Sequence, residues 1–437
     1  MNIIIAGAGK VGFNLARTLS IGHNVTIIDK NREALHRIQE RLDIMPLSGD
    51  VENSQTYEHF IDKKIDLFIA VTNVDNINLI ATLMADSVLQ IDKKIVRIRN
   101  HFYADSIVQE KLDIDTIVYP IQLASKAIVS LLQYPMANNV KFFKYTKQRL
   151  ISIRASSTIE PLQVSSENFI VAGIERDKSF FVPQEDIEIL PNDLVYFFGL
   201  EEHIKDICTQ LNSKKENMIQ NCVVFGANDL GLAISQELVN ANRDVKLVEK
   251  DLELCEKADE VLSGKASVIH SKYGITTLFE DEGLSSADIF ISATNNDEYN
   301  IAKCLEAREK GIQTVIAINN EIEYYSLMHS LGIIVVRGPK MSAYNKIMEE
   351  ISSTGVVIEK SFCGSKARVQ MRKVFPHSHL IAKKIKPLKV KQSKLFIMRD
   401  EKLLEIKEKS ILEKHDLVVT FCESRESAKV KQWVYEL

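Results

Sequence analysis

The chain has 437 residues, of which 45% are hydrophobic and 26% charged, and its formal net charge is −4 at pH 7. This length allows two to four domains, and the composition is that of an ordinary globular protein. The acidic balance argues against a protein that coats nucleic acid, so no nucleic-acid partner is expected. No apolar run approaches the roughly 18–20 residues that cross a bilayer, and we expect no signal peptide.

Short apolar runs alternate with helical stretches over the first 120 residues. The runs lie at residues 2–6, 25–28, 67–71, 95–98 and 117–119, with a weaker run near 44–47. They are nearly continuous in apolar residues, which is typical of strands buried on both faces of a parallel sheet. The alternation with helices predicts βαβ units and a doubly wound α/β sheet.

A glycine motif follows the first run directly, because residues 7–12 read Gly-Ala-Gly-Lys-Val-Gly. In a strand–turn–helix connection, Gly7 allows the tight turn, Gly9 allows a pyrophosphate to approach, and Gly12 lets the helix pack closely. Asp29 ends the next run, where a carboxylate accepts hydrogen bonds from ribose hydroxyls. A carboxylate there would also repel a 2′-phosphate, which favours NAD over NADP. The alternative is a glycine turn that binds nothing.

Polar residues near the ends of the later strands fit the same ligand. Gly49-Asp50 follows the third strand, Thr72-Asn73 follows the fourth, and Arg97 lies within the fifth. Ligands of open α/β sheets lie beyond the carboxyl ends of the strands. Each residue also has a plainer interpretation: Asp50 as a helix cap, Thr72-Asn73 as a turn or N-cap, and Arg97 as a surface or interface arginine.

The second half of the chain repeats this plan. Apolar runs recur at residues 222–225, 245–248, 267–269, 289–293, 314–318 and 333–336, about 220 residues after their counterparts. This spacing indicates an internal duplication. A tail rich in short alternating stretches follows each α/β half and is interpreted as a small α+β domain. We therefore predict two Rossmann-type domains, each followed by a small α+β domain, at residues 1–138, 139–216, 217–350 and 351–437.

The second glycine motif, Gly-Ala-Asn-Asp-Leu-Gly at residues 226–231, is less complete than the first. Asn228 replaces the middle glycine, and His270-Ser271 stands where the first half has Gly49-Asp50. The acid is retained as Glu249, and the later dipeptide as Thr294-Asn295. Two interpretations stay open: a second nucleotide site, weaker or for a mononucleotide, or a Rossmann unit kept for packing alone.

No catalytic constellation accompanies these motifs. The ten histidines are scattered, and G-x-S-x-G, H-E-x-x-H and Walker-type motifs are absent. None of the six cysteines has zinc-site spacing, so we expect reduced cytosolic thiols and no metal site. The basic stretch at residues 383–391 is interpreted as a solvated loop or a lysine-guarded edge strand. Its alternative is contact with an anionic lipid surface or an acidic partner.

Residues 4–12 (IIAGAGKVG), 69–73 (IAVTN) and 96–99 (VRIR), in this duplicated layout, closely resemble the TrkA family. These proteins are the cytoplasmic regulatory subunits of bacterial Trk potassium uptake systems. The resemblance covers nearly the whole chain and is sharpest in residues 1–120. It implies two RCK (KTN) units that bind NAD(H), and in some members ATP or ADP. It further implies a homo-oligomeric ring, expected to be a tetramer, on the inner face of the membrane beneath a TrkH- or TrkG-type subunit.

The function expected from residues and resemblance is regulation of a potassium transporter, without catalysis. The alternatives are an NAD-dependent oxidoreductase and a nucleotide sensor with another membrane partner. The candidate nucleotide contacts in the first unit are Gly7, Ala8, Gly9, Lys10, Val11, Gly12, Asp29, Asp50, Thr72, Asn73 and Arg97. Those in the second unit are Gly226, Ala227, Asn228, Asp229, Leu230, Glu249, Thr294 and Asn295.

Overall fold

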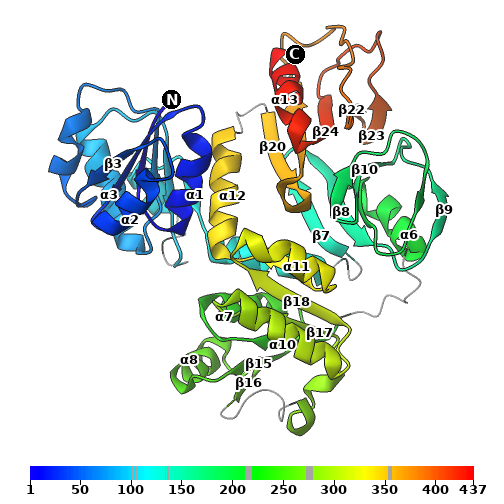
Figure 1. The fold of residues 1–437 in the computed structure, drawn as a ribbon, viewed down its shortest axis with the longest axis horizontal. Helices are drawn as coiled ribbons and strands as arrows, with labels where there is room; N and C mark the ends of the chain where they lie inside the picture. The colour runs from blue at the N-terminus through cyan, green and yellow to red at the C-terminus, as the bar shows by residue number, and fades with distance from the viewer. Residues whose placement is uncertain are drawn as a thin grey trace. The chain divides into compact units, whose positions relative to one another are not determined.

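The computed structural model describes residues 1–100, 103, 106–132, 134, 137–211, 219–271, 279–352 and 357–437. These residues form two compact units, of which the first comprises residues 1–125 and 337–351 and the second comprises residues 126–336 and 352–437. Figure 1 shows the order of the elements along the chain.

The first unit is built on a six-stranded sheet in the order β3-β2-β1-β4-β5-β6. Every adjacent pair of its strands is parallel. The order reverses between β1 and β4, and ligands of doubly wound sheets bind at such a point. The strands are β1 (Asn2–Ala6), β2 (Asn24–Asp29), β3 (Met45–Ser48), β4 (Leu67–Ala70), β5 (Lys94–Arg97) and β6 (Thr116–Val118).

Both faces of this sheet are buried, which explains the continuous apolar runs. Ile3 and Ile5 pack on one face with α1 (Lys10–Leu19) and α2 (Arg32–Gln39). Ile4 and Ala6 pack on the other face with the 3₁₀ helix η1 (Ser54–Phe60) and with α3 (Asp75–Val88). The remaining helices of this half are α4 (Ser106–Lys111) and α5 (Pro120–Leu132).

A helix from far along the chain completes the first unit. Ala343 and Ile347 of α12 (Pro339–Ser352) are buried in the same cluster as Leu15 of α1. The Tyr344 hydroxyl lies 2.8 Å from Thr18 Oγ1. The helix that follows the second repeat therefore contributes to the core beside the first glycine motif, a contact that the repeat pattern does not predict.

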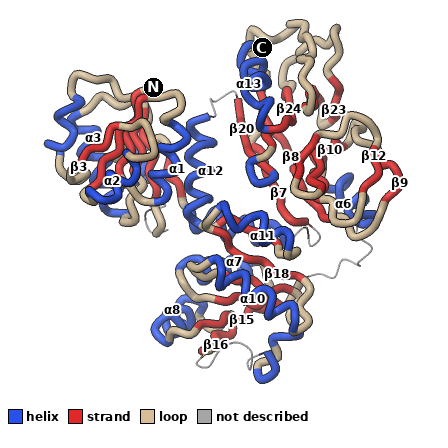
Figure 2. Tube along the Cα trace, viewed as in Figure 1, coloured by secondary structure: helices blue, strands red, loops and turns tan. Residues whose placement is uncertain are grey.

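The second unit contains a parallel sheet of the same design, in the order β16-β15-β14-β17-β18-β19. Figure 2 colours the strands red and the helices blue. Its strands are β14 (Asn221–Phe225), β15 (Asp244–Glu249), β16 (Ser267–His270), β17 (Ile289–Ser292), β18 (Thr314–Asn319) and β19 (Ile334–Arg337). The helices are α7 (Asp229–Asn240), α8 (Leu252–Leu262), η3 (Leu284–Ser286), α10 (Asp297–Glu309), η4 (Ile322–Tyr324) and α11 (Tyr325–Ser330). The predicted duplication of a doubly wound α/β unit is confirmed.

The second unit also contains two small five-stranded sheets, ordered β11-β10-β13-β8-β7 and β20-β21-β24-β22-β23. The first tail comprises β7 (Ala137–Phe143), β8 (Thr146–Arg154), β9 (Ile159–Leu162), β10 (Phe169–Arg176), β11 (Ser179–Phe181), β12 (Ile187–Ile189), β13 (Leu194–Gly199) and α6 (Glu201–Leu211). The second comprises β20 (Val357–Phe362), η5 (Cys363–Ser365), β21 (Ala367–Lys373), β22 (Ser393–Arg399), β23 (Lys402–Glu405), β24 (Leu417–Glu423), η6 (Ser424–Glu426) and α13 (Ser427–Glu436). Each tail thus pairs an antiparallel sheet with a C-terminal helix, as an α+β domain does.

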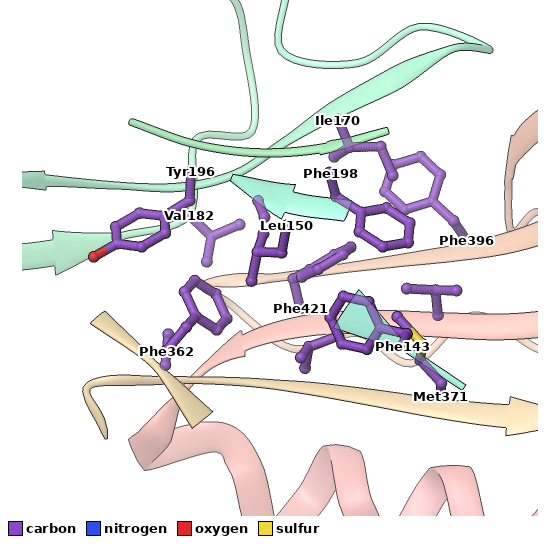
Figure 3. Packing of buried hydrophobic residues seen from close by; sticks show 14 of the residues in the cluster. Phe143, Leu150, Ile170, Val182, Tyr196, Phe198, Phe362, Met371, Phe396 and Phe421 are labelled. Atoms are coloured by element: carbon purple, nitrogen blue, oxygen red, sulfur yellow. The ribbon is translucent and has the colours of Figure 1, made fainter. Parts of the chain in front are cut away.

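The two small sheets share one aromatic core (Figure 3). The rings of Phe198 and Phe421 lie 5.2 Å apart, and those of Tyr196 and Phe362 lie 5.1 Å apart. Each pair joins one residue from each tail. Because neither small sheet is covered on this face by its own helix, the tails stabilise each other by burying these rings.

Candidate nucleotide-binding site

Two glycines of the first motif are required by the chain itself. Gly7 has a φ of +115°, which side chains rarely adopt, and a Cβ atom there would lie 2.9 Å from the Thr72 nitrogen. A Cβ atom on Gly12 would lie 1.9 Å from the Gly7 carbonyl oxygen. These positions therefore need glycine to form the turn and to bring α1 against it.

Gly9 has no such internal reason to be glycine. Its backbone is extended, with a φ of −73°, and a Cβ atom built on it meets nothing within 4 Å. It is the N-cap of α1, and no side chain caps this helix. A helix N-terminus that is left uncapped behind an open glycine is a ready anion site. The glycine turn and the N-terminus of α1 leave room for a pyrophosphate, because the space that a Cβ atom on Gly9 would occupy is where a phosphate approaches.

Asp29 fixes the glycine turn to the end of β2. Its Oδ2 atom accepts a hydrogen bond of 2.6 Å from the Ala8 N–H, and its Oδ1 atom accepts one of 2.8 Å from the Asn31 N–H. Each carboxylate oxygen has a further lone pair, so these bonds leave capacity for a ribose hydroxyl. The Gly49 N–H donates to the Asp29 carbonyl over 3.1 Å, which brings the Gly49-Asp50 turn to the same place.

The Asp50 carboxylate stabilises the turn in which it lies. Its Oδ1 atom accepts from the Glu52 N–H over 3.0 Å, and Lys30 Nζ lies 3.0 Å from its Oδ2 atom. The hydrogen bond from Glu52 and the nearby Lys30 ammonium lower the pKa of Asp50. The carboxylate is therefore ionised at neutral pH at the rim of the site.

Asn78, buried in α3, joins the ends of β4 and β5. Its Oδ1 atom accepts from the Thr72 N–H over 2.8 Å and from the Thr72 hydroxyl over 2.7 Å. Its Nδ2 atom donates to the Arg97 carbonyl over 2.8 Å. We therefore assign Asn78 as a positioning residue for Thr72 and Arg97. Asn78 lies outside the predicted contacts, although the repeat places Asn300 at the equivalent position of the second half.

Arg97 is a buried charged residue whose hydrogen-bonding capacity is largely unused. It is only 4% exposed, and its Nε atom has no hydrogen-bond partner. Its Nη1 atom makes one long bond of 3.4 Å to Asn73 Oδ1. Burial, together with the neighbouring Arg99 charge, lowers the pKa of Arg97 to about 10. The surface interpretation of this arginine is wrong, because a surface guanidinium would be hydrated.

The nearest acid does not neutralise Arg97 by contact. The Asp75 oxygens accept hydrogen bonds from the backbone N–H groups of Arg99 and Asn100, at 2.9 and 2.7 Å. Arg97 forms no ion pair within the part of the chain that the structure describes. A buried cation without a paired anion is costly, so a phosphate group at this position would relieve the cost.

The remaining candidates of the first unit lie around the same turn. Lys10 is exposed at the first position of α1, whereas the Val11 side chain is 3% exposed and belongs to the core. Val11 could therefore contact a ligand only through its backbone. Thr72 lies against Gly7, and Asn73 links it to Arg97. The structure thus gathers the candidates beyond the carboxyl ends of β1, β2, β4 and β5.

The second unit has the same glycine turn, but a side chain occupies the space that Gly9 leaves open in the first. Gly226 has a φ of +102°, and a Cβ atom on Gly231 would lie 1.7 Å from the Gly226 oxygen. Asn228 Oδ1 accepts from the N–H groups of Leu230 and Gly231, both at 3.0 Å. Its Nδ2 atom donates to the Ala293 carbonyl over 2.8 Å. The side chain that replaces the middle glycine therefore occupies the N–H groups that a phosphate would use.

The two acidic residues of the second turn also have partners within the chain. Glu249, only 8% exposed, accepts from the Ala227 N–H over 2.7 Å and from the Lys250 N–H over 2.7 Å. Asp229 opens α7 and lies 3.2 Å from Lys257 Nζ. Glu249 thus repeats the structural role of Asp29, while Asp229 adds a negative charge at the helix N-terminus.

The second parallel sheet has no arginine at the position equivalent to Arg97. Asn300 accepts from the Thr294 N–H over 3.0 Å and donates to the Ile318 carbonyl over 3.0 Å, as Asn78 does with Thr72 and Arg97. Ile318 therefore stands at the position of Arg97. Asn295 is exposed beside this turn. We call the region beyond the carboxyl ends of the strands of each parallel sheet its mouth. The first mouth has two features that attract anions, the uncapped N-terminus of α1 and the buried arginine. The second mouth has neither.

No group of three or more His, Cys, Asp or Glu side chains in the part of the chain that the structure describes is placed to hold a metal ion. None of the helices found there has the length and apolar character needed to cross a membrane.

A known protein family matches the chain twice, once in each repeat. The family described as the TrkA-N domain matches residues 3–120 and again 222–339, which together make up more than half of the chain. The chain belongs to the TrkA-N domain family. The two TrkA-N matches coincide with the two parallel sheets, and the predicted resemblance is confirmed.

Similar proteins cover almost all of the chain. The Trk system potassium uptake protein TrkA of Halomonas elongata is 28% identical over 371 residues, which are 82% of this chain and 80% of that protein. A TrkA homolog of Archaeoglobus fulgidus is 26% identical over 443 residues, which are 99% of each chain. Among solved structures, the GsuK RCK domain has a TM-score of 0.60 at 14% identity and covers 100% of this chain and 95% of its own. That likeness shows a shared fold.

Proposed function

We propose that this chain is a regulatory subunit of a membrane potassium transporter and that it binds NAD(H) at the mouth of its first Rossmann unit. The observation that carries the proposal is the cationic character of that mouth. The uncapped N-terminus of α1 lies behind Gly9, and the buried Arg97 has no paired acid among the residues that the structure describes. The names of the relatives, Trk system potassium uptake proteins, support the transport role.

The details of the ligand follow from the chemistry of the mouth. Asp29 stands where a ribose hydroxyl would donate and would repel a 2′-phosphate, which favours NAD(H) over NADP(H). An open helix N-terminus and an arginine recognise a diphosphate in any nucleotide, so ADP and ATP should compete for the same place. A GsuK channel of the same fold is described as bound to NAD, which supports this ligand class.

The partner and assembly are proposed from the resemblance to the TrkA family. We infer a TrkH- or TrkG-type membrane subunit, a ring of four chains, and a location on the inner face of the cell membrane. Nucleotide binding would change transport only if the nucleotide has different affinities for two shapes of the ring. No residue of the mouth is assigned to catalysis.

For the second mouth we propose weaker binding. A nucleotide contacting Gly226, Ala227, Asp229 and Leu230 would have to displace the Asn228 cap, which costs on the order of 1 kcal/mol. It would then find Ile318 in place of an arginine. Thr294, Asn295 and Glu249 remain as contacts for the sugar side of the nucleotide.

A calorimetric titration of the intact chain with NADH, ADP and ATP tests these assignments. We expect one tight class of NADH sites per chain. Asp29→Ala should weaken that class by about 1–3 kcal/mol, roughly five- to 150-fold, through loss of charge-assisted hydrogen bonds. Glu249→Ala is the matched control, because Glu249 holds the equivalent turn and should leave the tight class unchanged.

Two outcomes would contradict the proposal. Loss of the tight class in Glu249→Ala rather than in Asp29→Ala would move the site to the second mouth. Catalytic oxidation of NADH with a small substrate would favour the oxidoreductase alternative over a regulator.

A further inference from the structure

A large part of the last small domain is free of acidic residues. Between residues 360 and 399 the sequence contains no Asp or Glu but twelve Lys and Arg, although the whole chain carries a net charge of −4. Five of these lysines lie at residues 383–391, in the connection from β21 to β22. We call residues 383–391 the lysine loop. A concentration of one charge sign on a chain of the opposite net sign needs an explanation.

Packing of the loop's apolar residues turns its lysines outward. Ile385 is 1% exposed and belongs to a buried cluster. Leu388, Val390 and Trp433 of α13 pack together against a second buried cluster. Trp433 Nε1 also donates to the Lys386 carbonyl over 3.2 Å. The lysines between these anchors are exposed, namely Lys384, Lys386, Lys389 and Lys391. The loop is therefore an ordered scaffold that displays ammonium groups.

These lysines have no acidic partner within the described residues, in contrast to other lysines of the same domain. Lys366, Lys402 and Lys431 form ion pairs with Glu175, Glu167 and Glu359. None of the five lysines of the loop forms an ion pair there, and among the described residues only the Lys383 side chain donates a hydrogen bond, to the Leu437 carbonyl over 2.6 Å. The charge of the loop is thus available to something outside the chain.

The first small domain shows that the fold does not require this charge. Its corresponding connection, from β8 to β10 at residues 155–168, contains two Glu and no Lys or Arg. The two sheets have the same strand order, so the loops are equivalent. If lysines only protected the loop from aggregation, the first copy would need them equally.

Apolar side chains are exposed beside the lysines. Ile381 is 38% exposed and Ile411 is 43% exposed. Lys384 pairs with Ile411 through an isolated antiparallel bridge, so this isoleucine lies directly beside the loop. Ammonium groups next to exposed aliphatic side chains suit the boundary between lipid headgroups and acyl chains.

We infer that the lysine loop is a contact surface for an anionic lipid bilayer. Lysine is a flexible point charge, which matches the diffuse negative charge of headgroups better than a single fixed carboxylate. The loop itself contains no arginine, the residue that would bind the carboxylates of an acidic peptide in a fixed bidentate geometry. This surface lies in a different unit from the first nucleotide mouth, and the inference does not depend on nucleotide binding.

Co-sedimentation of the intact chain with phosphatidylcholine vesicles, with and without phosphatidylglycerol, tests the inference. We expect binding only to the anionic vesicles, with a strong decrease between about 0.1 M and about 0.5 M NaCl because of screening. The triple variant Lys384→Ala, Lys386→Ala, Lys389→Ala should bind about a hundredfold more weakly. Replacement of the same three lysines by arginine should preserve binding, and both variants should keep the NADH affinity of the parent chain.

The matched control is Lys407→Ala, Lys409→Ala, Lys414→Ala, which removes the same charge from exposed positions of the same domain. Glu408 and Glu413 lie among these lysines, so their local charge is already offset. We expect the control to bind anionic vesicles nearly as well as the parent chain. Equal losses in the two triple variants, equal binding to neutral vesicles, or binding to an acidic protein without any binding to vesicles would overturn the inference.

Discussion

Replacing Arg97 by methionine is expected to weaken NADH binding by about a hundredfold without destabilising the nucleotide-free protein. The buried guanidinium has one long hydrogen bond and an unpaired Nε atom, so the fold gains little from it. Methionine fills similar space without the desolvation cost, and the free energy of unfolding should stay the same or rise. Hydrogen bonds between a guanidinium and a phosphate contribute about 1.5–3 kcal/mol each, which sets the expected loss of affinity.

Arg372 offers a matched control for this prediction. It is also buried, and burial lowers its pKa. Its Nη1 atom, however, donates to the carbonyls of Val434 and Tyr435 at 2.6 and 2.7 Å, at the end of α13. Arg372→Met should therefore lower the free energy of unfolding by about 1–3 kcal/mol and leave NADH affinity unchanged.

Urea unfolding and NADH titration of the two variants separate the roles of the arginines. A buried arginine that serves the fold and one that serves a ligand should change opposite quantities. If Arg97→Met lost as much stability as Arg372→Met and kept its NADH affinity, Arg97 would be a structural residue and the proposed mouth would lose its cation.

The difference between these arginines shows where sequence reasoning about this chain stops. The spacing of apolar runs and glycines was enough to predict both parallel sheets, because each run reports local burial on two faces. The state of Arg97 depends on residues brought by β4 and α3, so its position within a strand did not reveal its burial. Asn78 recurs in the repeat, but its hydrogen bonds to two strand ends could not be read from the sequence.

The second unit illustrates the same limit. The replacement of Gly9 by Asn228 was visible in the sequence, but its consequence was not. Only the hydrogen bonds show that the amide caps α7 and also reaches the Ala293 carbonyl. The loss of the arginine at Ile318 was invisible without the register that Asn300 fixes. The packing of α12 on α1 likewise joins residues more than 300 positions apart.

Replacing the glycines of the first motif by alanine is expected to change different quantities, NADH affinity at Gly9 and the free energy of unfolding at Gly12. Gly9→Ala should leave the free energy of unfolding unchanged or raise it by up to about 1 kcal/mol, since alanine adopts its extended backbone and has fewer unfolded states. Its NADH affinity should fall at least about tenfold, because the methyl group would occupy the approach of the pyrophosphate. Gly12→Ala should lower the free energy of unfolding by about 1–3 kcal/mol or more, because α1 must move away from the Gly7 carbonyl.

Gly231→Ala is the matching variant in the second unit, because its Cβ atom would lie 1.7 Å from the Gly226 oxygen. It should destabilise the protein as Gly12→Ala does while the tight class of NADH sites is retained. Unfolding curves and NADH titrations of the three variants then distinguish a glycine kept for a ligand from glycines kept for the turn. Full NADH affinity in Gly9→Ala would mean that no pyrophosphate approaches α1. The fingerprint would then be a packing motif in both copies.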